Sequence, residues 1–457
     1  MSGVSSADGD QSSGTSTAGQ PVRDRTNRRA PGRDRYLDLL RAIALARVVA
    51  FHTFGGAVFA LIFPSMGVMF ALAGSLMARS LERPALGVLA GRTRRLLLPL
   101  WVYSLTVLVL LFVHGWRPGQ TGNGSLQPLL PWFVPLAHPL YPPSLGGEDA
   151  FLAATWPESA SGILWYIVAY FWFMLLSPLL LKAYKARPLL SLFAPLALMA
   201  CLAPGLVPLP AGTGATITNF AMYGSCWMLG FAYEAGHLRG VPARVVFTAG
   251  PALMGLGFWL AAADQGVTGW DVSINGTPLG GALWAFGFSA MLLRISPSWK
   301  ELPRPIRFLD RFVTLVNNRA MTVYLWHNIL IVLIAALRNP LYSVEAVREH
   351  APWLLWEKWP LYLAVWVALG VVCLGVGWVE DVSARRPARL WPDGSRREPR
   401  VRRASSRRDG SASNGWMWMY PRSFRDSARV FLEPGAAVPP EPVVARRPGT
   451  TGPPTPG

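Results

Sequence analysis

Long apolar stretches separated by short polar connections make up most of this chain. Ten such stretches lie between residues 37 and 379, each close to the ~20 residues that a membrane-spanning helix needs. The second contains Pro64 and the eighth is rich in glycine, which makes these two the weakest candidates. The stretches are residues 37–57, 60–78, 96–114, 161–181, 189–209, 218–235, 245–263, 278–293, 314–336 and 359–379. The pattern predicts an all-α, polytopic membrane protein with ten transmembrane helices.

Polar sequence flanks the apolar region at both ends. Residues 1–35 are rich in Ser, Gly and Arg and lack an apolar core, so we expect a disordered cytoplasmic arm and no cleavable signal peptide. Residues 384–457 are rich in Arg, Pro and Ser, which is typical of a disordered basic tail. The transmembrane domain is therefore expected at residues 36–383.

The composition excludes a soluble protein and argues against a nucleic-acid partner. The chain is 52% hydrophobic and 15% charged, which leaves too little polar sequence to coat 457 residues. Its net charge of +18 is concentrated, because residues 384–457 hold 15 Arg against six acidic residues. Basic tails beside membrane helices are typical of contact with anionic lipid. We therefore expect the lipid bilayer, and not nucleic acid, as the partner of this charge.

Lys and Arg also alternate between the two sides of the predicted membrane domain. The connections on the side of the N-terminus, with both ends, hold 37 of the 43, whereas the other loops hold only Arg117, Arg338, Arg348 and Lys358. Without the two ends the ratio is 16 to 4, a bias that marks cytoplasmic loops. We expect a multi-pass protein of the plasma membrane with both termini in the cytoplasm. The longest outer loop, residues 115–160, is either a lid or a spacer.

The first apolar stretch carries four ionisable residues, Asp38, Arg41, Arg47 and His52. Such residues are costly in a bilayer and therefore mark a site. Arg41 and His52 are eleven residues apart, which places them on one helix face about 16 Å apart. We predict that Asp38 pairs with Arg41 at the membrane edge, and that His52 is a base buried near mid-membrane. The alternative is that His52 is a hydrogen-bonded packing residue.

Two other segments hold candidate site residues. Arg92 and Arg95 are three residues apart in GRTRRLLLP (91–99), where Pro99 is expected to mark a helix start. Two guanidinium groups on one face suit phosphate, although Arg at a helix end is also an ordinary cytoplasmic anchor. Tyr324 and His327 are neighbours on one helix face, either as packing residues or as a wall of the site.

Common motifs of other chemistries are missing from the sequence. The histidines and the three cysteines have no metal-ligand spacing, so we expect no bound metal or cofactor. There is no G-x-S-x-G motif, Walker-type loop or dinucleotide fingerprint. Hydrolase and nucleotidyl chemistry therefore lack support.

Four segments resemble the integral-membrane acyltransferase family 3, of the O-antigen acetylase type. LDLLRAIALARVVAFH (37–52) resembles its opening helix, and RTRRLLLP (92–99) resembles its R-x-x-R motif. LWYIVAYFWFMLLSPLL (164–180) is similar to its Leu-Trp helix, and NRAMTVYLWHNILI (318–331) to its late Tyr-x-x-His helix. The resemblance covers about residues 36–380, and the opening helix is its most specific part.

This resemblance implies an acyl-CoA-dependent O-acyltransferase, commonly an O-acetylation enzyme of carbohydrate modification. It implies a cytoplasmic acyl-CoA co-substrate and a glycan, glycolipid or metabolite acceptor. His52 would be catalytic, either as a base or through a transient acyl-histidine. The other expected substrate-binding residues are Asp38, Arg41, Arg92, Arg95, Trp165, Tyr324 and His327. Many members of the family carry an acidic residue soon after the Trp of the Leu-Trp helix. Here Trp165 is followed by YIVAYFWF, which weakens the assignment of a polysaccharide acceptor.

The alternative function is a non-enzymatic transporter or a component of a cell-envelope export system, since ionisable residues in membrane helices also serve proton relays. The sequence shows no repeated pair of Gly/Pro-broken helices, which argues against a transporter. A membrane acyltransferase of the other large family is disfavoured because its key histidine is expected late in the chain.

Overall fold

The computed structural model describes residues 34–117, 127–142, 144–145, 151–203, 205, 207, 209 and 213–389. These residues all belong to the first of two units, Met1–Arg396, and the second unit, Arg397–Gly457, lies outside the described residues. Residues 1–33 of the predicted arm and 390–457 of the predicted tail also lie outside them.

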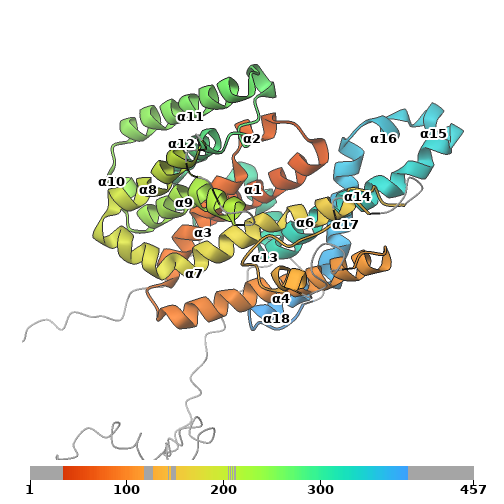
Figure 1. The fold of residues 1–457 in the computed structure, drawn as a ribbon, viewed down its shortest axis with the longest axis horizontal. Coiled ribbons are helices and arrows are strands. Elements are labelled where there is room, and N and C mark those ends of the chain that lie inside the picture. The colour runs from red at the N-terminus through yellow and green to blue at the C-terminus, as the bar shows by residue number, and fades with distance from the viewer. Residues whose placement is uncertain are drawn as a thin grey trace, which may run out of the picture. The chain divides into compact units, whose positions relative to one another are not determined.

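The described residues form helices and no strand, which confirms the all-α prediction (Figure 1). The elements are α1 (Arg35–Phe54), α2 (Val58–Ile62), α3 (Ser65–Ser80), α4 (Ala85–Val113), η2 (Gln127–Leu129), α5 (Leu130–Phe133), α6 (Trp156–Gly162), α7 (Leu164–Ala186), α8 (Pro188–Leu202), α9 (Gly214–Glu234), α10 (His237–Gly240), α11 (Ala243–Gln265), η3 (Gly269–Asp271), α12 (Pro278–Ile295), η4 (Arg304–Leu309), α13 (Asp310–Asn318), α14 (Ala320–Arg338), η5 (Asn339–Ser343), α15 (Glu345–His350), α16 (Pro352–Trp356), α17 (Trp359–Gly375) and α18 (Trp378–Ser383).

Six helical segments of the described chain are long and apolar enough to cross a membrane. They are Val58–Ser80, Ala85–Val113, Trp156–Ala186, Ala243–Gln265, Pro278–Ile295 and Ala320–Ser343. Two shorter apolar helices are α8 and α17, and α1 has 20 residues but carries several charges. The protein is therefore a multi-pass membrane protein by length and composition, while the predicted count of ten spans is not confirmed.

The first helix is bounded by local chemistry at both ends. The carboxylate of Asp34 accepts a hydrogen bond from the backbone N–H of Tyr36 at 3.0 Å, which satisfies a free donor at the start of α1. At the other end Gly55 has φ 70° and Gly56 has φ 89°, a conformation that favours glycine. The chain turns there and enters α2, and Pro64 then separates α2 from α3.

The predicted start of the third apolar helix is wrong. We expected it near residue 96 with Pro99 at its beginning, but α4 begins at Ala85 and Pro99 lies inside it. Pro84 precedes the helix, where its fixed φ suits a helix start. The sequence obscured this start, because Arg92, Arg94 and Arg95 interrupt the apolar pattern after the first two turns of α4. Arg92 and Arg95 consequently sit within a continuous helix and not in a connecting loop.

Small residues allow the central helices to approach closely. A Cβ atom on Gly74 of α3 would collide with the backbone carbonyl of Trp227 in α9, and one on Gly230 of α9 would collide with Ala71 and Ser75 of α3. Glycines of α11 and α12, at positions 257 and 280, bring those two helices together in the same way. Close backbone contact at small residues is the usual way in which membrane helices associate.

The chain after α17 packs back onto the domain instead of leaving it. α18 lies against α4 (Figure 1), and Arg94 donates a hydrogen bond from Nε to the carbonyl of Ser383 at 2.8 Å. The wholly buried Arg319 donates from Nη2 to Asp381 at 2.9 Å and to the carbonyl of Arg389 at 2.8 Å. Residues 384–389 therefore differ from the expected tail, because they are part of the folded unit.

Candidate functional site

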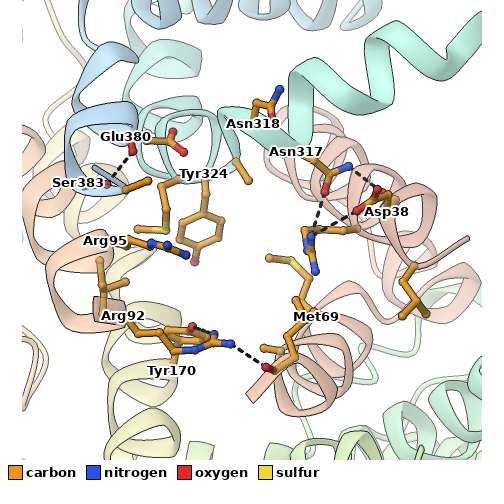
Figure 2. A pocket seen from close by; sticks show the side chains of 18 of the residues that line it. Asp38, Met69, Arg92, Arg95, Tyr170, Asn317, Asn318, Tyr324, Glu380 and Ser383 are labelled. Carbon is orange, nitrogen blue, oxygen red and sulfur yellow. Dashed lines mark hydrogen bonds and ion pairs between the residues drawn. The ribbon is translucent and has the colours of Figure 1, made fainter. Parts of the chain in front are cut away.

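A cavity of about 570 Å³ opens among α1, α3, α4, α7, α13, α14 and α18. Its volume lies within the range of small-molecule sites, roughly 300–1,000 Å³. Figure 2 shows Arg92 and Arg95 on one side of this cavity and Asp38 and Asn317 on the other. Residues of α1 and of α4, the helix with the R-x-x-R spacing, therefore line the same cavity.

Arginine is the most frequent polar residue in the lining of this cavity. Five arginines line it, namely Arg41, Arg79, Arg92, Arg95 and Arg386, together with four acidic residues, Asp34, Asp38, Glu380 and Asp381. Arg79 is paired with Glu234 at 2.8 Å, and Asp381 is paired with Arg319. Several guanidinium groups thus surround one space, an arrangement that suits a ligand with more than one negative charge.

The predicted pair of Asp38 and Arg41 is present on α1. Their closest charged atoms are 3.8 Å apart, but Asp38 lies nearer to the buried Arg35, at 3.1 Å. Asn317 of α13 joins the two sides: its Oδ1 accepts from Arg41 at 3.3 Å and its Nδ2 donates to the carbonyl of Asp38 at 2.8 Å. Asp38 therefore helps to hold α1 against α13 and to orient Arg41 at the cavity.

Arg92 and Arg95 differ in their surroundings, which the sequence did not indicate. Arg92 donates to the hydroxyl of Tyr170 at 3.2 Å, and to the Leu76 carbonyl and the Ser80 hydroxyl at 2.8 Å each. Arg95 makes no hydrogen bond or ion pair within the described part of the chain. The charged groups that act on it are other arginines, Arg386 first among them. The Arg95 side chain is exposed in the cavity, where its guanidinium can bind a ligand.

Glu380 supplies a titratable group to the cavity wall. Its Oε1 accepts from the backbone N–H of Thr322 at 2.7 Å and from the Thr322 hydroxyl at 2.6 Å. Burial raises the pKa of the Glu380 carboxyl from 4.5 to about 7, although these hydrogen bonds favour the carboxylate. The charge of this wall therefore changes near neutral pH.

His52 and His327 lie side by side, beyond the residues that line the cavity. Their ring centroids are 5.1 Å apart, and the ring of Tyr324, which does line the cavity, is 5.7 Å from His327. The prediction that Tyr324 and His327 are neighbours is therefore confirmed. Tyr324 is the residue that connects the arginine-lined cavity to the two histidines.

The sequence predicted a buried side chain for His52, and the structure differs from this prediction. The side chain of His52 is exposed, and the residue lies two positions before the end of α1 at Phe54. The sequence suggested an unbroken apolar stretch to residue 57, but Gly55 and Gly56 end the helix earlier. His327 is the buried member of the pair, with no exposed surface.

Aromatic side chains surround the connection between the cavity and the histidines. The ring of Tyr324 lies 5.0 Å from that of Tyr166, and the Tyr324 hydroxyl donates to the Ile163 carbonyl at 2.7 Å. Trp165, predicted as a substrate-binding residue, stacks on Tyr223 at 5.6 Å and does not line the cavity. The hydrogen bond and the ring contact therefore fix the position of Tyr324, whereas Trp165 packs outside the cavity lining.

Several cavity residues were missed at the sequence level. Tyr166 and Tyr170 lie one turn apart on α7 in a stretch that shows only apolar character, and Arg386 lay in the predicted tail. Arg47 is ionisable, but the sequence predicts no role for it. Its Nε donates to the Phe59 carbonyl at 2.9 Å, and its Nη2 is buried with no partner in the described chain.

No three His, Cys, Asp or Glu side chains come together as a metal site among the described residues. The polar groups that converge here are guanidinium, carboxyl, amide, phenol and imidazole groups. These can bind anionic groups and move a proton.

Fold and site together define a multi-pass helical membrane protein with a basic cavity beside a pair of histidines. The acyltransferase domain that characterises acyltransferase family 3 matches residues 34–379, and the chain belongs to this family. Membership indicates a membrane acyltransferase and confirms the resemblance seen in the sequence. No curated protein matches the chain, and no solved structure matches it.

Proposed function

We propose that this protein transfers an acyl group, acetyl in the simplest case, from acyl-CoA to a hydroxyl of a glycan, glycolipid or metabolite. The observation that carries the proposal is the exposed Arg95 guanidinium in a cavity whose wall, at Tyr324, adjoins the His327–His52 pair. Such a layout offers a place for a phosphorylated donor and, beside it, a base.

The donor phosphates are expected at the arginine side of the cavity. Arg95 and Arg386 supply charge, and Arg92 is fixed by its bonds to α3 and α7. Planar guanidinium groups bind phosphate oxygens in pairs, so several of them can hold a nucleotide with multiple phosphates. The positive-inside bias of the sequence favours the cytoplasm for this side, where acyl-CoA is made.

The acyl end of the donor would pass Tyr324 to reach His52. Arg41 and His52 are about 16 Å apart along α1, and the pantetheine arm of CoA is of comparable length. Because His52 is exposed, an acceptor hydroxyl can approach its ring. His52 then takes the hydroxyl proton as the oxygen attacks the thioester carbonyl. A transient acyl-histidine is the alternative. A label that stays on the protein after a rapid denaturing quench near neutral pH, and that acid or hydroxylamine removes, would indicate it.

The proposal is tested with washed membranes that contain the protein and with matched membranes that lack it. Radiolabelled acetyl-CoA is added, and both free CoA and label in extracted acceptors are measured. Acyl transfer predicts that CoA is released in step with acceptor labelling. The rival function, a transporter or export component, predicts movement of the acceptor without consumption of acetyl-CoA. Absence of CoA release and labelling above the matched membranes would refute the enzyme.

Replacing Arg95 with alanine should weaken donor binding selectively. A charged hydrogen bond contributes about 1.5–3 kcal/mol, so the KM for acyl-CoA should rise roughly 10- to 100-fold while kcat changes little. The measurement is initial rate against acyl-CoA concentration for Arg95→Ala. Arg187→Ala is the matched control, since Arg187 is exposed at the end of α7 and does not line the cavity. An unchanged donor KM in Arg95→Ala would exclude a phosphate contact.

Donor binding should also weaken as pH rises through 7. Deprotonation of Glu380, whose pKa is about 7, adds a negative charge to the wall that faces the donor phosphates. One such charge costs about 1 kcal/mol, or roughly fivefold in KM. Glu380→Gln keeps an oxygen for Thr322 but cannot ionise. The ratio of KM for the unmodified protein to that for Glu380→Gln should therefore rise between pH 6 and pH 8, and a constant ratio would contradict this role.

A further inference from the structure

The buried imidazole of His327 has one ring nitrogen whose role is fixed by its partner. Its Nδ1 lies 2.6 Å from the carbonyl oxygen of Tyr324. A carbonyl oxygen only accepts hydrogen bonds, so Nδ1 must carry the hydrogen. The neutral ring then presents a lone pair at Nε2. His327 is therefore held as a hydrogen-bond acceptor at Nε2.

This acceptor has no partner within the described chain. Nε2 of His327 is buried and makes no hydrogen bond. The phenol of the neighbouring Tyr324 does not serve it, because the hydroxyl of Tyr324 donates to the Ile163 carbonyl. A buried acceptor without a donor costs about 1–3 kcal/mol. A group that donates to Nε2 during the reaction cycle would recover this free energy.

The adjacent side chain that can donate is His52. Its ring centroid is 5.1 Å from that of His327, with the ring planes at 53°. No hydrogen bond within the described residues engages His52, so its ring can turn toward His327. Catalytic hydrogen bonds are often long in the free enzyme and tighten when substrates bind.

We infer that His327 is a positioning residue that accepts a hydrogen bond at Nε2 from one ring nitrogen of His52. The other ring nitrogen of His52 is thereby left with its lone pair facing the acceptor hydroxyl. The inference rests on the proposed acyl transfer and deepens it. It also replaces the substrate-binding role expected for His327 from the sequence. The arrangement resembles the logic of the hydrolase triad, with a neutral imidazole in place of the carboxylate.

The proton balance of the transfer is complete with these two side chains. The acceptor hydroxyl gives its proton to the free nitrogen of His52 as its oxygen forms the new C–O bond with the thioester carbon. The C–S bond then breaks, and His52 returns the proton to the CoA sulfur. His327 accepts the same hydrogen bond throughout and neither gains nor loses a proton.

Two substitutions at position 327 separate positioning from packing. His327→Gln places its side-chain amide near the position of Nε2, whereas His327→Asn places it near Nδ1. Positioning predicts that the Gln variant keeps a maximal rate within about tenfold of the unmodified protein, and that the Asn variant loses about 100-fold. The KM for acetyl-CoA should be unchanged in both.

Three results would overturn the inference. If the contact of Nδ1 with the Tyr324 carbonyl is what matters, the Asn variant will be at least as active as the Gln variant. If His327 binds the acceptor, the acceptor KM will rise while the maximal rate stays constant. The third result applies if both variants fail to fold. A structure of the unmodified protein with a non-reactive acetyl-CoA analogue then tests whether His52 and His327 are hydrogen-bonded. A His52 nitrogen about 3 Å from His327 Nε2 is expected, and rings left without a hydrogen bond would refute it. Failure of the unmodified protein to transfer acyl groups would instead refute the proposed function.

Discussion

His52→Ala should abolish acyl transfer almost completely while leaving the protein folded. Removal of a general base lowers the rate by about 10²- to 10⁴-fold. Folding should be preserved because the His52 side chain is exposed and makes no hydrogen bond within the described chain. The KM for acyl-CoA should stay close to that of the unmodified protein, since Arg95 and the other cavity arginines are untouched. The maximal rate in washed membranes, normalised to the amount of protein, measures the effect.

The matched control is another exposed histidine of the same domain. His350 ends α15 and lies away from the cavity, so His350→Ala should keep full activity. Thermal unfolding of the solubilised proteins should give the same midpoint for both variants. If His52→Ala kept its activity, the base would have to be a different group, and the positioning role of His327 would lose its purpose.

The parts of the site that the sequence predicted depend on short, regular spacing. Asp38 and Arg41 are one turn apart on a single helix, and so are Tyr324 and His327. The structure confirms both as neighbours. A helix fixes such pairs whatever surrounds it. The acyltransferase family could also be identified from the sequence, because each of its motifs lies within a single helix.

What the sequence could not reveal depends on helix ends and on long-range partners. Gly55 ends α1 before the predicted apolar stretch ends, so His52 lies near the end of the helix. At the other helix, α4 starts at Ala85, before the stretch that the sequence predicted from residue 96. The contrast between Arg92 and Arg95 comes from Tyr170 and Ser80, which belong to other helices. No local pattern reveals which of two similar arginines is already engaged.

The C-terminal wall of the cavity was missed for a related reason. Arg-rich sequence after residue 384 predicts disorder by composition. A buried cation overrides this composition, because Arg319 binds both Asp381 and the carbonyl of Arg389. Asp381 and Arg386 line the cavity as a result. The position of this wall therefore depends on an ion pair in the core.

Breaking that ion pair should destabilise the protein far more than breaking an exposed ion pair of the same domain. Arg319 and Asp381 are 0% and 2% exposed in their side chains. Removing one member of a buried pair leaves the other charge without compensation, at about 3–5 kcal/mol. Arg319→Ala should therefore lower the thermal midpoint of the solubilised protein sharply. Any surviving protein should show a raised KM for acyl-CoA, because α18 no longer holds the cavity wall.

The exposed pair of Arg307 and Glu301 provides the comparison. Their side chains are 60% and 55% exposed, so Arg307→Ala should cost at most about 1 kcal/mol. The double substitution Arg319→Met with Asp381→Leu removes both buried charges and should recover much of the loss in the thermal midpoint. Donor binding should recover less, since Asp381 also accepts from the backbone N–H of Arg389 at 3.3 Å. If the double variant were no more stable than Arg319→Ala, the instability would come from lost packing and not from an unpaired charge.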